Sequence, residues 1–153
     1  MEVSFHANIC YKTTEKIAFA LHSPFEIIGK ELSKNYGGIM EHLWIDFELI
    51  PSQSPWSFRF QKRVSGNSAK YLTGLSSPDK YNVGHYSVKP DFIKLLKIPP
   101  ESVANYALSL IYQSTSILFD KQKILGEFDT NKFRLDFLSA CKKNGFNINN
   151  SAP

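Results

Sequence analysis

The segment Glu41-His42-Leu43-Trp44-Ile45-Asp46-Phe47-Glu48 alternates polar and apolar residues with a period of two. Because successive side chains of a strand point to opposite faces of a sheet, this alternation predicts a strand with one buried and one exposed face. The exposed face would carry an imidazole, an indole and two carboxylates, from His42, Trp44, Asp46 and Glu48. Three of the chain's 14 acidic residues fall in this segment, which contains no Lys or Arg. Such a surface suits either recognition or acid–base chemistry.

Alternating runs predict strands at residues 3–10, 39–50, 56–64 and 81–88, and the second of these strands contains the segment above. A short polar link at residues 51–55 joins the second strand to the third, and such a link is typical of an antiparallel pair. Residues 65–80 lack periodicity and are rich in Gly and Ser. We expect a long loop there, which in a compact domain is more often functional than accidental.

Helices are predicted mainly in the last third of the chain. A short helix is expected at residues 90–97, a longer one from residue 99 onward, and a final one capped by Asp129 or Thr130 and followed by Gly145. An earlier helix is expected over residues 23–36, because Ser23-Pro24-Phe25-Glu26 has the residue types of a helix start. Residues 16–22 fit either a strand or the lead-in to that helix.

These elements predict an α+β fold, with an antiparallel sheet and helices packed mainly on one side. A length of 153 residues fits one domain, which we place at residues 1–146, followed by a flexible polar tail at residues 147–153. Hydrophobic residues make up 42% of the chain and aromatic residues 14%, which excludes intrinsic disorder of the whole chain.

The cysteines and the N-terminus indicate the compartment. Cys10 and Cys141 are the two cysteines and lack metal-ligand spacing, which favours a reducing environment. The first residues alternate and lack the basic start and apolar block of a secretion signal. No apolar run approaches the ~20 residues of a membrane span. We therefore expect a cytoplasmic protein that does not enter a membrane and that uses no metal and no cofactor.

The net charge of +4 is concentrated in residues 51–100, which hold eight basic and two acidic residues. In this part of the chain Arg59, Lys62, Arg63 and Lys70 lie close to aromatic residues such as Trp56 and Tyr71. Basic and aromatic residues together can bind nucleic acid through phosphate contacts and stacking. An ordinary strand with a solvated side explains the same pattern, and the chain has no nucleic-acid-binding motif, so we favour the simpler interpretation.

The candidate catalytic residues do not form a recognisable set. At 3.3 Å per residue, His42 and Asp46 would lie ~13 Å apart on one strand, which is too far for one metal ion. Asp46 and Glu48 would lie ~6.6 Å apart, a spacing that resembles paired carboxylates only if a pocket encloses them. His85, with Tyr86 or Lys89 nearby, could serve a small ribonuclease as acid or base, but it also fits an ordinary strand-end histidine. We expect no enzymatic activity.

The segment at residues 41–48 and the run Tyr81-Asn82-Val83-Gly84-His85-Tyr86-Ser87-Val88-Lys89-Pro90-Asp91-Phe92 give the chain a family resemblance. In these segments, in size and in aromatic content, it resembles the small cytoplasmic immunity proteins of bacterial polymorphic toxin and contact-dependent growth inhibition systems. The resemblance implies a single-domain, often α+β, non-enzymatic protein that binds and neutralises a cognate toxin domain.

For such a protein we expect the partner to contact Glu41, His42, Trp44, Asp46, Glu48, Arg59, Lys70 and Tyr71. Many such inhibitors are acidic, whereas this chain has a pI near 9.0. Either the acidic strand and the loop make the contact locally, or an acidic partner meets the region from Arg59 to Lys70. Two alternatives from other classes are a small basic RNA-directed enzyme that uses His85 and a nucleic-acid-binding accessory protein without activity.

Overall fold

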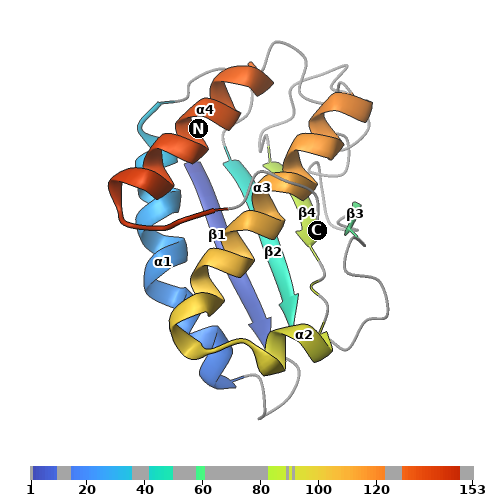
Figure 1. Ribbon diagram of the computed structural model, residues 1–153. Helices are drawn as coiled ribbons and strands as arrows, with labels where there is room; N and C mark the ends of the chain where they lie inside the picture. The colour runs from blue at the N-terminus through green and yellow to red at the C-terminus, as the bar shows by residue number, and fades with distance from the viewer. Residues whose placement is uncertain are drawn as a thin grey trace.

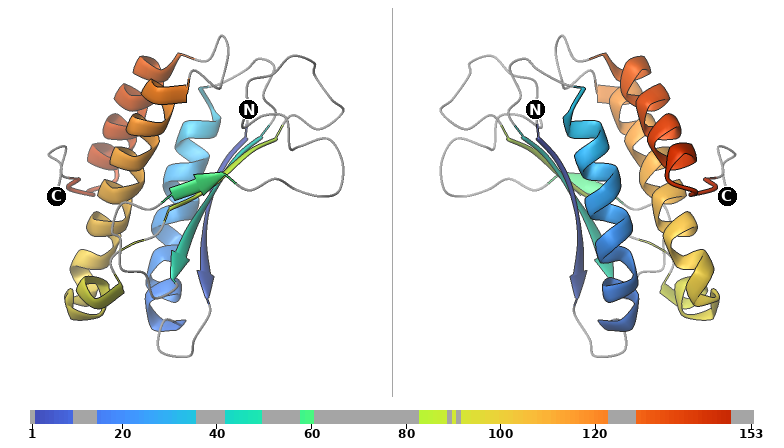
Figure 2. Two further views of the ribbon diagram at one scale, coloured as in Figure 1. Left: turned by 90° about the vertical axis from the view of Figure 1, so that its right-hand side faces the viewer. Right: turned by 90° about the vertical axis from the view of Figure 1, so that its left-hand side faces the viewer.

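Four strands form one sheet, and helices lie along one of its faces (Figures 1 and 2). The computed structural model describes residues 2–9, 15–35, 42–49, 58–60, 83–88, 90, 92–122 and 129–148. In chain order the elements are β1 (Glu2–Ile9), α1 (Glu15–Ser33), β2 (His42–Leu49), β3 (Phe58–Phe60), β4 (Val83–Val88), α2 (Phe92–Lys97), the 3-10 helix η3 (Pro100–Ser102), α3 (Val103–Gln122) and α4 (Thr130–Lys143). The loop predicted at residues 65–80 lies outside the described residues.

The sheet is mixed, with the strand order β1-β2-β4-β3. β1 pairs with β2 and β2 pairs with β4 in parallel, whereas the short β3 pairs with β4 in the antiparallel direction. The predicted antiparallel sheet is therefore wrong, and so is the predicted pairing of residues 39–50 with residues 56–64. Helix α1 carries the chain back along the sheet, so that β1 and β2 run in the same direction. Since β2 lies between β1 and β4, it has no edge left for β3.

Helix α1 begins at Glu15 and continues through the predicted start at Ser23, so that Pro24 lies inside it. Its buried residues, Ala18, Leu21, Phe25, Ile28, Gly29 and Leu32, follow helical spacing on both sides of the proline. A proline inside a helix costs ~3 kcal/mol, because it removes one backbone hydrogen bond and crowds the preceding turn. Burial of this continuous apolar face offsets that cost, which explains why the predicted helix start is wrong and why residues 16–22 are helical.

The contact between α1 and β1 is unusually close. A Cβ atom at Gly29 would lie 2.7 Å from the carbonyl oxygen of Val3, so only glycine permits this approach. One turn further along α1, Ser33 Oγ accepts a hydrogen bond from the Val3 N–H at 2.8 Å and donates one to the Gly29 carbonyl at 2.7 Å. The end of α1 thus occupies a backbone donor at the outer edge of β1, as proteins do to block pairing of an exposed strand edge.

Phenylalanine rings connect the sheet to two helices. The Phe5 ring of β1 lies 5.8 Å from the ring of Phe25 in α1 and 5.9 Å from that of Phe137 in α4. Phe25 in turn lies 6.0 Å from Phe47 of β2. These tilted and edge-to-face pairs add ~0.5–1.5 kcal/mol each to the burial of their surfaces. The core therefore lies between the sheet and the helices on one of its faces.

The start of α4 confirms the prediction made from its sequence. The carboxylate of Asp129 accepts a hydrogen bond from the Lys132 N–H at 2.9 Å, and Gly145 follows the helix with a φ of 79°. Beyond it, the N–H of Asn147 donates to Asn105 Oδ1 at 3.0 Å. Residues 149–153 of the predicted tail lie outside the described residues.

Candidate functional site

The candidate site is the face of the sheet opposite the helices. Ile45 and Phe47 of β2 are fully buried, and the neighbouring Val3 and Phe5 of β1 are also buried, with 3% and 7% of their surface exposed. Because positions alternate along a strand, those between them belong to the other face. Figure 2 shows α1, α3 and α4 on one side of the sheet, and no described helix lies on the other. We define the polar sheet face as the strand positions on that second side. They are Glu2, Ser4, His6, Asn8, His42, Trp44, Asp46, Glu48, Val83, His85, Ser87 and Arg59.

The register arranges this face in rows that run across the strands. In one row, Trp44 of β2 stands between Ser4 of β1 and His85 of β4. In the next row, Asp46 stands between His6 and Ser87, and Arg59 of β3 follows Ser87. The structure therefore brings four of the predicted contact positions on β2 and the predicted Arg59 onto one face. Glu41, Lys70 and Tyr71 lie outside the described residues.

None of the contact residues predicted from the sequence lies in β1. Ser4 and His6 are half-buried, and the Ser4 hydroxyl and His6 Nε2 are 3.1 Å apart in a hydrogen bond. The alternation of residues 3–10 indicated a strand, but it contained no information about which strand would be its neighbour. The register Glu2–His42, Ser4–Trp44 and His6–Asp46 follows from the parallel pairing of β1 with β2.

The row that contains His6, Asp46 and Ser87 has the residue types of a hydrolase triad in the wrong order. A triad places the histidine between the nucleophile and the carboxylate. Here the aspartate is the central residue. Because neighbouring strands are ~4.8 Å apart, the backbones at His6 and Ser87 are separated by roughly 10 Å. The order of the three positions across the sheet therefore differs from that of a triad.

The acid–base pair considered for a ribonuclease is also divided between two faces. His85 is in register with Trp44 on the polar sheet face, whereas Tyr86 is in register with the buried Ile45. Adjacent positions of a strand belong to opposite faces, so Tyr86 does not share a face with His85. Lys89 lies outside the described residues. Within the described residues, no group of three His, Cys, Asp or Glu side chains is placed to hold a metal ion.

A groove of about 680 Å³ adjoins the polar sheet face between β1 and α1. The residues Glu2, Ser4 and His6 line its β1 wall. The opposite wall is formed by α1 and includes His22, Glu26, Ile27, Lys30, Glu31 and Lys34. Since Ser4 and His6 belong both to this groove and to the polar sheet face, the polar surface continues around the edge of the sheet.

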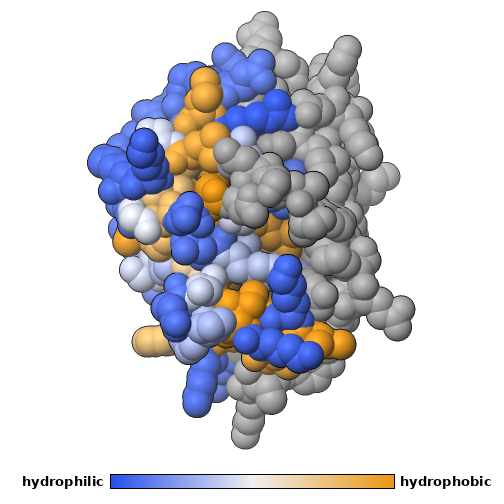
Figure 3. Space-filling view, in the orientation of Figure 1, coloured by the Kyte–Doolittle hydropathy of each residue, from blue (hydrophilic) through white to orange (hydrophobic). Residues whose placement is uncertain are grey.

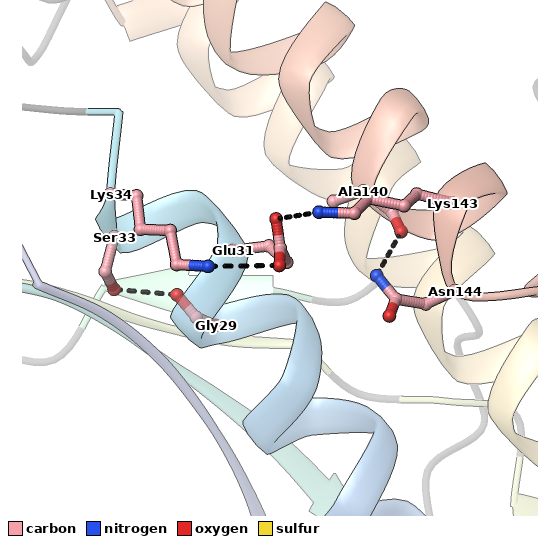
Figure 4. Close-up of polar contacts among 7 residues, drawn as sticks. All are labelled: Gly29, Glu31, Ser33, Lys34, Ala140, Lys143 and Asn144. Carbon is pink, nitrogen blue, oxygen red and sulfur yellow. Dashed lines mark hydrogen bonds and ion pairs between the residues drawn. The ribbon is translucent and has the colours of Figure 1, made fainter.

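The carboxylates on the α1 wall are held in their charged form. Lys30 donates a hydrogen bond to Glu26 and lowers the pKa of that carboxyl, and His22 Nε2 lies 3.9 Å from its other oxygen. The pKa of Glu31 is also lowered, first by the hydrogen bond from Lys143 at 3.1 Å and then by the one from Lys34 at 3.2 Å. Figure 4 shows that Glu31 thereby joins α1 to α4. These ion pairs lie at the surface and each contributes little to stability.

Exposed apolar side chains lie on the helix side of the molecule. Ile93 and Leu96 of α2 are 66% and 50% exposed, and Figure 3 shows hydrophobic surface next to hydrophilic residues at α2. Leu135 of α4 and Phe19 of α1 are exposed on other helices. Single apolar side chains of this kind are normal on protein surfaces, so we do not assign a site to them.

No protein-family model, no curated protein and no solved structure matches this chain. In the part of the chain that the structure describes, none of the helices is both long enough and apolar enough to cross a lipid bilayer.

Proposed function

We propose that this chain is an immunity-type protein that binds a cognate toxin domain and blocks its active site. The docking surface is the part of the polar sheet face on β2, β3 and β4, and the protein acts in the cytoplasm by binding and not by catalysis. The proposal rests on the resemblance of residues 41–48 and 81–92 to such proteins and on one structural observation. That observation is the placement of His42, Trp44, Asp46, Glu48, His85 and Arg59 on one face of the sheet.

This face has the composition of a protein-binding surface. Aromatic and Arg residues supply most of the binding energy at protein interfaces, and charged residues set specificity and the association rate. The face combines Trp44 and Arg59 with two carboxylate positions, at Asp46 and Glu48. The opposite face of the same strands contributes to the core, so we expect substitutions at Asp46 and Glu48 to leave the packing of that core intact.

The experiment that tests the proposal has two parts. The product of the gene next to this one is co-expressed with the chain and purified, and the complex is sought by size-exclusion chromatography. Cells that produce the neighbouring protein are then grown with and without this chain. Formation of a complex together with restored growth is the expected result. A neighbouring protein that neither binds nor inhibits growth would contradict the proposal.

A further inference from the structure

We infer that the docking surface extends onto β1 and that its occupant is a cationic patch on the partner protein. Glu2, Ser4 and His6 then determine specificity together with the contact positions on β2, β3 and β4. The inference rests on the proposed function, since it names further contacts of the same site.

The first step is the register of β1 and β2. Glu2, Ser4 and His6 face His42, Trp44 and Asp46 position by position across adjacent strands. Neighbouring strands are only ~4.8 Å apart, so residues in register on adjacent strands lie side by side on the same face. A protein surface that covers Trp44 and Asp46 therefore also covers Ser4 and His6. Since standard interfaces bury ~800 Å² on each partner, a single strand is too narrow to form one.

The second step is the distribution of charge. β1 and β2 contain no Lys or Arg, and the positions of the polar sheet face include three acidic residues, Glu2, Asp46 and Glu48, and one Arg, at position 59 in β3. By contrast, α2 and α4, which do not belong to this face, hold six basic residues and one acidic residue. The net charge of the whole chain is +4, so the acidic character of β1 and β2 is local. An opposing surface with Lys and Arg complements it, whereas an acidic surface is repelled.

The shape of the surface beside β1 also suits a long basic side chain. The groove between β1 and α1 opens beside Ser4 and His6 and has a volume of about 680 Å³. Its apolar lining includes Phe25 and Ile27. Lys and Arg place their aliphatic stems along apolar surface and keep the charged group in water. Two lysines on its α1 wall, Lys30 and Lys34, are paired with glutamates of the same helix, and Glu2 lies on the β1 wall. The groove therefore gives such a side chain room at the edge of the sheet.

The test uses opposite charges at one position. Ser4→Glu and Ser4→Lys are compared for binding to the purified product of the neighbouring gene, with Ser139→Glu and Ser139→Lys as matched controls. Ser139 is exposed on α4, a helix that lies on the side of the sheet opposite the polar sheet face. At 0.15 M salt the Debye length is ~8 Å, so charges at Ser139 are screened from the polar sheet face. Circular dichroism and thermal unfolding verify the fold of each variant.

We expect Ser4→Glu to bind more tightly than Ser4→Lys, with a difference of roughly tenfold in Kd, and the two Ser139 variants to bind alike. The difference should shrink as salt is raised. If either Ser4 variant is misfolded, Glu2→Lys and Glu2→Gln replace the pair, because Glu2 is exposed. The lysine variant should then bind more weakly than the glutamine variant.

The outcomes separate this inference from the proposed function. If Asp46→Lys with Glu48→Lys weakens toxin binding while the β1 variants do not, the proposed function stands and the extension onto β1 is wrong. Tighter binding by Ser4→Lys would mean an acidic partner and would overturn the inference. Self-association of the wild type that Ser4→Lys abolishes would assign the face to a second copy instead. Absence of toxin binding by the wild type would remove both proposals.

Discussion

The hydroxyl of Ser33 in α1 accepts a hydrogen bond from the backbone N–H of Val3 in β1 at 2.8 Å. This bond joins residues 30 positions apart and satisfies a donor at the edge of the sheet. Ser33→Ala leaves that partly buried N–H without its partner, so we expect a loss of about 1–2 kcal/mol in the free energy of unfolding, measured with urea. Ser139→Ala, an exposed substitution on α4, is the control and should change stability by less. Equal effects would mean that the Ser33 bond does not stabilise the sheet.

Gly29→Ala should also destabilise the protein. Alanine normally favours a helix over glycine by ~1 kcal/mol, so an exposed position would gain stability. At Gly29 the added Cβ would lie 2.7 Å from a backbone oxygen, which cannot move without separating α1 from β1. We expect a net loss of about 1–3 kcal/mol, the usual cost of overpacking. A stabilised variant would contradict the close approach of the helix to the strand.

Ser23→Ala distinguishes the two possible starts of α1. If Ser23 capped the helix, its replacement would cost ~1 kcal/mol. Because Ser23 lies inside a helix that begins at Glu15 and is exposed, we expect no loss or a slight gain in stability. Asp129→Ala, which removes the cap of α4, is the positive control and should cost ~1 kcal/mol. The measurement is urea unfolding of both variants.

Asp46→Lys with Glu48→Lys should weaken toxin binding by several kcal/mol through like-charge opposition, provided that the polar sheet face meets a cationic partner. The fold should persist, because the buried neighbours Ile45 and Phe47 belong to the other face of β2. Isothermal titration with the product of the neighbouring gene measures the effect. Unchanged affinity would place the interface elsewhere.

The Glu31 carboxyl should titrate below its ordinary range, because Lys143 and Lys34 lower its pKa. A carboxyl whose pKa is lower in the folded state contributes stability at pH values above its unfolded pKa, and this contribution is lost as the pH falls through the folded pKa. NMR titration of the Glu31 side chain in the wild type and in Lys143→Gln tests the cause. The variant should titrate at a higher pH, while Lys142→Gln, which changes a neighbouring lysine, should not shift Glu31.

The thiol of Cys141 should not react while the protein is folded. Cys141 is fully buried, and burial raises the pKa of its thiol to about 12. Because the thiolate is the reactive form, we expect no labelling by a thiol reagent at pH 8 until denaturant unfolds the chain. Cys10→Ser is the background for this measurement, so that a single thiol is observed. Rapid labelling in native buffer would contradict the burial of Cys141.

Elements whose signals are local could be predicted from the amino-acid sequence. The alternation in residues 41–48 identified β2 and separated its polar positions from Ile45 and Phe47, and Asp129 with Gly145 marked both ends of α4. These signals depend on the backbone of a few neighbouring residues, so they can be recognised without knowing the rest of the fold. The helix start predicted at Ser23 and Pro24 was wrong, because the apolar face of α1 extends past these residues. Burial of that face outweighs the cost of the proline inside the helix.

Which strands are neighbours depends on packing between distant segments of the chain. Alternation along a strand shows on which face of the sheet a residue lies. It does not show which strand is the neighbour or in which direction that neighbour runs. The pairing of His6 with Asp46 joins positions 40 residues apart and depends on the return of the chain through α1, which in turn requires Gly29 to approach Val3. The residues of β1 therefore join the polar sheet face through packing between distant segments, and the sequence around His6 contains no local sign of it.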